Sequence, residues 1–246
     1  MLKVMPPAYD ELYAQLLADA ASAARVPEAE VTPFWPIAGW KFDGSLLAVG
    51  RSVNGWVHNW RIGELREAST RHVLMDQARR DAEPTDRCRM LWVTDLAGRT
   101  SHPYNTNRSA FWRVLRETVS SVIEVDATDW PSHLAWTNLY KLAPAAGWNP
   151  GADLQLAQRG AAIRLLEAEI AALRPRRILF LTGRWWAEPL ATSLGMDIEW
   201  TTGLVEGAGR YRAAQVVVAK HPMGKPHREL VAQVLGAFDR SVGVGA

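Results

Sequence analysis

Short apolar runs alternate along the chain with longer stretches in which apolar residues recur at helical spacing. The short runs predict buried strands, because β-branched and other apolar residues bounded by turn residues are typical of a sheet interior. The predicted strands are 46–50, 90–94, 134–139, 177–183, 198–201 and 215–220. The predicted helices are 8–25, 57–80, 109–120, 153–173, 185–194 and 225–240.

Alternating strands and helices predict an α/β fold whose parallel strands are covered on both faces. We expect one domain over residues 1–246, with three α/β/α layers around a central, mainly parallel four-stranded sheet. Residues 1–45 are expected to form an N-terminal helix and loop extension, since 26–45 holds three prolines and Gly39. We find no internal repeat and no low-complexity tract.

Composition narrows the class of protein further. The 246 residues are 48% apolar and 22% charged, which is ordinary for a globular domain. No apolar stretch approaches the roughly 20 residues of a membrane helix, and the first residues lack a signal-type apolar core. We therefore expect a cytoplasmic protein with no membrane partner. The net charge of +2 is too small to indicate nucleic-acid binding by itself.

Cysteine and histidine usage bears on metal chemistry. Cys88 is the only cysteine, which excludes an intrachain disulfide, a cysteine-ligated iron–sulfur cluster and a multi-cysteine zinc site. The six histidines form no HxxxH pair. We expect no cofactor and no metal.

Polar residues follow three of the predicted strands at the point where each strand ends. His221-Pro222 follows the run 215–220, and proline ends a strand because it cannot donate to the ladder. The strand 46–50 runs into a polar turn through Trp56, and 134–137 ends in Asn138. Open α/β sheets build their sites at the carboxyl ends of strands, so these groups predict one pocket.

These segments, in this order, resemble the uracil-DNA glycosylase superfamily over roughly residues 44–240. Residues 49–54 match the loop after its first strand, and 221–224 match its last loop, of His-Pro-Ser type. The run 107–115 is similar to the Asn-Arg-Phe-Trp-x-Val-Leu run of the mismatch-specific thymine/uracil branch, with Ser-Ala inserted. Residues 136–141 are similar to the Thr-Asn-Leu-x-Lys stretch of other branches, and 177–183 resemble the late strand of the family, which ends in Leu-Gly.

The resemblance implies hydrolysis of the N-glycosidic bond of a nucleotide flipped out of DNA. His221 would stabilise the leaving base, Tyr104 would stack on it and Asn138 would read its edge. Structural alternatives stay open: a loop tyrosine, a turn-capping asparagine and a core histidine. The other residues expected around the base are Arg51, Trp56 and Asn105. The residues expected to hold DNA phosphates are Lys220, Lys225, His227 and Arg228.

The first motif departs from the family pattern at the residue that activates water. Ser52 stands where the family has Asp or Asn, and a hydroxyl cannot take a proton from water at neutral pH. The candidates to replace that group are Asn54, which could position water, and Asp95, the carboxylate after the strand 90–94.

The same loop bears on the substrate. Asn54 and Gly55 stand where uracil-specific members carry a tyrosine against the base 5-position. We therefore expect excision of pyrimidines with large 5-substituents, such as hydroxymethylated or glucosylated cytosine, with a role in defence against phage. DNA is the expected partner of a monomeric enzyme. The alternatives are a uracil or mismatch glycosylase of base-excision repair and a non-catalytic DNA-binding relative. Two glycines and no Walker lysine at 50–55 disfavour a nucleotide phosphate loop.

Overall fold

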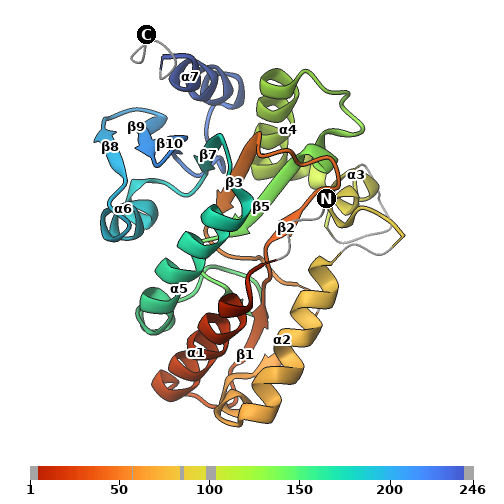
Figure 1. Ribbon diagram of the computed structural model, residues 1–246, viewed down its shortest axis with the longest axis vertical. Coiled ribbons are helices and arrows are strands. Elements are labelled where there is room, and N and C mark those ends of the chain that lie inside the picture. Colours follow the sequence, from red (N-terminus) through yellow and green to blue (C-terminus); the bar gives the residue numbers. More distant parts are fainter. Residues whose placement is uncertain (1–4, 57, 84–85, 98–103, 241–246) are drawn as a thin grey trace.

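A computed structural model describes residues 5–56, 58–83, 86–97 and 104–240 (Figure 1). The helices are α1 (Pro7–Ala23), α2 (Ala68–Ala82), α3 (Trp92–Asp95), α4 (Ala110–Ile123), α5 (Ala152–Leu173), α6 (Arg184–Ser193) and α7 (His227–Arg240). Four 3-10 turns accompany them: η1 (Ile62–Arg66), η2 (Arg89–Leu91), η3 (Thr106–Arg108) and η4 (Trp130–His133). The ends of the predicted 1–246 domain and part of the predicted loop 95–107 lie outside the described residues.

The strands form two sheets. They are β1 (Glu30–Pro33), β2 (Ile37–Ala38), β3 (Leu46–Gly50), β4 (Trp60–Arg61), β5 (Leu134–Asn138), β6 (Leu142–Pro144), β7 (Arg177–Phe180), β8 (Asp197–Trp200), β9 (Val205–Tyr211) and β10 (Ala214–Ala219). The large sheet has the order β2-β5-β3-β7-β10-β9-β8. The small sheet has the order β4-β1-β6.

The predicted α/β class is confirmed, but the predicted four-stranded sheet is wrong. The central sheet has seven strands and is mixed. Its inner strands β5, β3, β7 and β10 run parallel, while β2, β9 and β8 pair antiparallel. Strand β2 is only two residues long, and β9 carries Gly207 and Gly209, so neither shows the apolar run that identifies a buried strand.

Three local predictions are also corrected. The expected helix 57–80 starts only at α2, because β4 and η1 precede it. The expected strand 90–94 consists of η2 followed by α3, because Met90 and Val93 share one buried face at helical spacing. The expected loop 26–45 contains β1 and β2, and β1 pairs with both β4 and β6. The N-terminal extension therefore belongs to the folded body rather than lying beside it.

Helices cover the large sheet from two sides. Helix α1 packs along α5, and α4 packs along α7. Figure 1 shows α4 and α7 together beyond one side of the sheet, with α5 and α6 on the other. Strands β3, β5 and β10 are buried at every residue, which places the core around the parallel strands.

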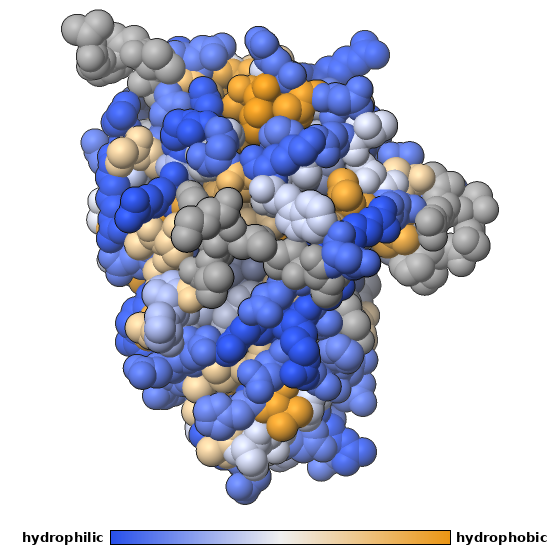
Figure 2. All heavy atoms as spheres, turned by 45° about the vertical axis from the view of Figure 1, so that its right-hand side comes forward, coloured by the Kyte–Doolittle hydropathy of each residue, from blue (hydrophilic) through white to orange (hydrophobic). Residues whose placement is uncertain are grey.

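The surface is mostly polar where it can be seen. Figure 2 shows a face on which hydrophilic side chains predominate and apolar atoms form separate patches. Broad contiguous apolar patches mark interaction surfaces, and the described residues drawn on this face form none. Among the described residues, no helix has the length and apolar character required to cross a bilayer.

Candidate functional site

The carboxyl ends of the four parallel strands meet at one edge of the sheet. Gly50 of β3 lies opposite Asn138 of β5 in the register. The chain after β7 continues the ladder, since Leu181 N donates to Val49 O at 3.0 Å and Gly183 N donates to Ala219 O at 2.9 Å. The groups that follow β3, β7 and β10 are therefore neighbours, as the strand-end pattern predicts.

An open pocket of about 430 Å³ lies at this edge. Its volume is within the range of about 300–1,000 Å³ that is typical of small-molecule sites. Basic, aromatic and acidic side chains line it together. The lining residues are Arg51, Thr182, Gly183, Arg184, Trp185, Trp186, Glu206, Lys220, His221, Met223 and Lys225. Arg51, Lys220, Lys225 and His221 of the sequence prediction thus lie in one place.

His221 is held neutral in this pocket. Burial, followed by the charge of Arg51, lowers the pKa of its imidazole to about 4. Its Nδ1 lies 3.3 Å from the backbone nitrogen of Met223 and accepts that N–H. A neutral ring whose Nδ1 accepts carries its proton on Nε2, so His221 presents one N–H donor.

Arg51 is fixed beside His221 rather than free in solvent. Its Nε donates to the carbonyl of Thr182 at 2.7 Å, and its guanidinium lies 5.1 Å from the ring centre of Trp186. Half-burial lowers its pKa, and the charge of Glu206 opposes that effect. A guanidinium bonded and stacked in this way forms a rigid wall of the pocket.

Asn138 lies next to this pocket but does not line it. The residue is 1% exposed, and its Nδ2 donates to no described residue. A Cβ on Gly50 would overlap Oδ1 of Asn138, so the glycine makes room for the amide. Buried amide donors without a partner are rare in folded proteins, so this Nδ2 is a candidate ligand contact.

A fully buried ion pair lies directly behind Asn138. Lys141 Nζ contacts Glu169 Oε1 at 2.8 Å, and both side chains are completely buried. The same ammonium donates to the carbonyl of Asn138 at 2.6 Å and to Thr137 Oγ1 at 2.8 Å. Tyr9 and Thr137 donate to Glu169 at 2.6 and 2.7 Å, which completes the network. Sequence analysis missed its role, although a lysine inside an apolar stretch was a usable signal.

The first-motif candidates for water activation hold a neighbouring loop. Asn54 Oδ1 accepts the backbone N–H of Trp148 at 2.9 Å. Ser52 Oγ donates to Asn149 Oδ1 at 3.4 Å. Neither residue lines the pocket. Both are therefore occupied in connecting the turn after β3 to residues 147–149.

Asp95 is placed differently from its prediction. It ends helix α3 instead of a strand, because 90–95 forms helical turns. Its Oδ1 accepts from Arg87 at 2.6 Å, and it does not line the pocket. The strand-end argument therefore does not apply to this carboxylate.

The candidate stacking residues belong to an aromatic cluster. Tyr104 lies 6.3 Å from Trp92 between ring centres, and Trp56 lies 5.6 Å from Trp136. Neither lines the 430 Å³ pocket. Asn105 is the N-cap of η3 and accepts from Asn107 N at 3.0 Å. These three residues have local structural contacts that the sequence could not reveal.

The predicted phosphate-binding residues divide into two groups. Lys220 and Lys225 line the pocket, and Arg228 is exposed on the first turn of α7. His227 instead lies 2.8 Å from Glu117 Oε1, joining α7 to α4. Its ring is therefore less available to DNA than the three cations beside it.

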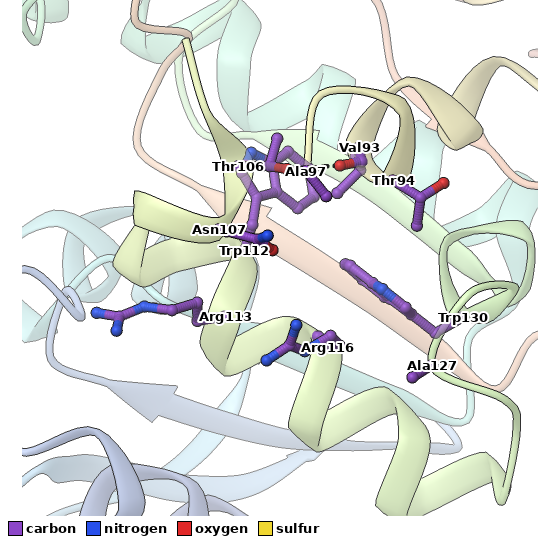
Figure 3. A pocket seen from close by; sticks show the side chains of 10 residues that line it. All are labelled: Val93, Thr94, Ala97, Thr106, Asn107, Trp112, Arg113, Arg116, Ala127 and Trp130. Carbon is purple, nitrogen blue, oxygen red and sulfur yellow. Dashed lines mark hydrogen bonds between the residues drawn. The ribbon is translucent and has the colours of Figure 1, made fainter. Parts of the chain in front are cut away.

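A second, smaller cavity borders α4. Figure 3 shows Arg113 and Arg116 extending from that helix, with Trp130 of η4 across from them. The cavity measures about 50 Å³, which accommodates a few water molecules and no base. It is therefore not a candidate for the substrate site.

Three pocket features were not anticipated from the sequence. Trp185 and Trp186 lie in the first turn of α6, which follows Gly183, and the strand–glycine–helix pattern was a usable signal. Glu206 lies on β9, a strand that the apolar pattern did not predict.

Within the ranges that the structure covers, no group of three or more His, Cys, Asp or Glu residues could hold a metal ion.

Comparison with known proteins yields no matching family model and no matching curated protein. The site is therefore interpreted from its own geometry.

Proposed function

We propose that this protein is a DNA glycosylase that hydrolyses the N-glycosidic bond of a flipped, 5-substituted pyrimidine, acting as a cytoplasmic monomer. One observation carries the proposal: neutral His221 offers an Nε2–H donor at an edge where Asn138 keeps a buried, unpartnered amide. Such donors match the charge that develops on a departing pyrimidine and the polar atoms of its edge.

The surroundings suit a DNA substrate. Lys220, Lys225 and Arg228 provide cations around the His221 loop for phosphates. Met223 is 72% exposed at the tip of this loop, beside Gly224 with a φ of 70°. An apolar side chain presented between cations is suited to enter a base stack, which lowers the cost of flipping a nucleotide.

The first-motif turn supports a substrate with a large 5-substituent. Asn54 is drawn toward Trp148, and a Cβ on Gly55 would meet only Ala145 O at 3.9 Å. Apart from its chain neighbours Asn54 and Trp56, no described side chain comes within 4 Å of that position. Hydroxymethylated and glucosylated cytosines are the substrates we propose, in the context of phage defence.

A non-catalytic DNA-binding relative is the second candidate. The occupied side chains of Ser52 and Asn54 favour it, because neither is free to activate water. This candidate predicts DNA binding without base release.

The test is a cleavage assay on duplexes that carry uracil, a thymine mismatch, 5-hydroxymethylcytosine or its glucosylated form. We expect release of the 5-substituted bases and a fall of about 10²–10³-fold in His221→Ala, the usual effect of removing one donor to a developing anion. His133→Ala is the matched control, since His133 contacts Asp129 outside the pocket. Release of uracil alone would overturn the substrate class. DNA binding without release of any base would favour the non-catalytic candidate.

A further inference from the structure

We infer that Glu206 supplies the water-activating carboxylate that the first motif lacks. The inference rests on the proposed function. It concerns a residue of β9, whose neighbour β10 ends at Ala219, just before His221. Gly207 pairs with Val218, and Val205 pairs with Ala219.

Glu206 is the one carboxylate among the described residues that line the pocket. The other acidic residues considered have different places. Asp95 pairs with Arg87 away from the pocket, and Glu188 pairs with Arg184 on the exposed face of α6. Ser52 carries no carboxylate.

One oxygen of Glu206 is fixed and the other is available. Oε2 accepts the backbone N–H of Arg184 at 2.7 Å, at the start of α6. No described residue donates to Oε1. A carboxylate held in this way has a defined orientation and one oxygen left for water.

Gly183 marks where Glu206 meets the cationic wall of the pocket. A Cβ built there would lie 3.5 Å from Oε2 of Glu206 and 3.7 Å from Nη2 of Arg51. Arg51 also interacts electrostatically with His221. The carboxylate, the guanidinium and the imidazole therefore surround one space at the ends of β7 and β10.

The chemical step then balances without any further reactant. Glu206 accepts a proton from water as the water oxygen bonds to C1′ of the deoxyribose. The C1′–N1 bond breaks, and its electron pair leaves with the base, whose carbonyl accepts the Nε2–H of His221. The proton then passes from Glu206 through solvent to the base, so the products are the free base and an abasic sugar.

The test separates catalysis from binding. Glu206→Gln keeps an oxygen acceptor for Arg184 N but cannot take a proton. We expect its single-turnover excision rate to fall about 10²–10⁴-fold, the range for loss of a general base. Its Kd for a duplex with a cleavage-resistant 2′-fluoro nucleotide should stay within about threefold, since loss of a general base affects proton transfer in the chemical step.

Glu188→Gln is the matched control. It removes the same charge beside Arg184, outside the pocket, and should leave the rate within about threefold of wild type. If Glu206→Gln does not fold, Glu206→Asp takes its place, with a rate loss of at least about tenfold expected because the carboxylate is withdrawn.

The outcomes distinguish the two proposals. Wild-type activity with an equally active Glu206→Gln overturns the role of Glu206 and leaves the proposed function standing. A parallel loss of rate and of duplex binding also overturns it, because it assigns Glu206 to binding. A wild-type protein that releases no base from any of the duplexes overturns both.

Discussion

His221 shows how one residue can be tuned by its immediate contacts. Its imidazole is desolvated, lies near a guanidinium and accepts a backbone N–H, and each of these contacts favours the neutral ring. The neutral ring keeps one donor, Nε2–H, which can stabilise an anionic leaving group by a hydrogen bond. The charge state of His221 therefore depends on Arg51 as well as on burial.

We expect Arg51→Gln to raise the pKa of His221 above its wild-type value of about 4. The value should stay below 6.5, because burial remains the larger cause. NMR titration of the ring nitrogens measures this directly, with His221→Gln for assignment. Arg184→Gln is the control, since Arg184 is not among the causes of the shift. An unchanged pKa in Arg51→Gln would contradict the electrostatic coupling.

The lowered pKa of His221 also determines whether its contribution to folding stability rises or falls with pH. The unfolded chain binds the proton near pH 6.5, while the folded chain resists it until about pH 4. The contribution of His221 to stability is thus present above pH 6.5 and is lost as the pH falls toward 4.

Residue-level prediction from the sequence succeeded where strand ends determine position. His221 and Arg51 follow buried strands, so the parallel sheet brings them together. Tyr104 carries no such positional signal, and Trp56 stands at the far end of the turn after 46–50; both pack in an aromatic cluster instead. The charge partners of individual side chains depend on tertiary contacts that no local pattern encodes.

At the scale of elements, the buried Lys141–Glu169 pair joins the segment between β5 and β6 to α5, and Tyr9 adds α1 to the same network. Burial lowers the pKa of the Lys141 ammonium, and the charge of Glu169 opposes this. Because Lys141 also holds the carbonyl of Asn138, the network connects the N-terminal helix to the candidate site.

We expect Lys141→Met to lower the free energy of unfolding by about 3–5 kcal/mol, because it leaves Glu169 buried without its counter-charge. Chemical denaturation measures the loss. Lys41→Met is the matched control, since its pair with Asp129 has a side chain 60% exposed, and we expect a change of at most about 1 kcal/mol there. Equal effects of the two substitutions would show that burial of the Lys141 pair is not decisive.

Whether a segment is a helix or a strand was predictable where its apolar pattern was long. The prediction failed where the pattern was short. The run 90–94 is apolar enough for a strand, but five residues cannot separate a buried strand from helical turns. Strand β9 was missed because Gly209 is required for backbone contact: a Cβ there would overlap the carbonyl of Asp197 on β8.

At the scale of the whole molecule, parallel pairing of β5, β3, β7 and β10 explains why distant segments form one site. Their carboxyl ends share an edge, as the alternation of strands and helices predicted. The antiparallel β8 and β9 extend the sheet beyond β10 and bring Glu206 to the pocket. Of these two strands, only β9 was not predicted from the apolar pattern, and it carries the carboxylate for which we propose the water-activating role.

The distribution of charge leads to the last prediction, on the salt dependence of DNA binding. The net charge of +2 is small, but Lys225 and Arg228 are exposed next to the pocket. Each phosphate contact releases counterions, so Lys225→Ala and Arg228→Ala should each reduce the slope of log K against log salt by about 1. Fluorescence anisotropy between about 50 and 200 mM salt measures the slope.

Arg212→Ala is the control for this series. Arg212 lies in the turn between β9 and β10, at the opposite end of β10 from His221, and pairs with Glu167. The Arg212→Ala substitution removes one positive charge, as Lys225→Ala and Arg228→Ala do. A change in net charge alone would therefore affect all three variants equally. A slope reduced only by Lys225→Ala and Arg228→Ala places the phosphates at the pocket. An equal reduction in Arg212→Ala would instead indicate diffuse attraction, and the proposed DNA path over the His221 loop would be wrong.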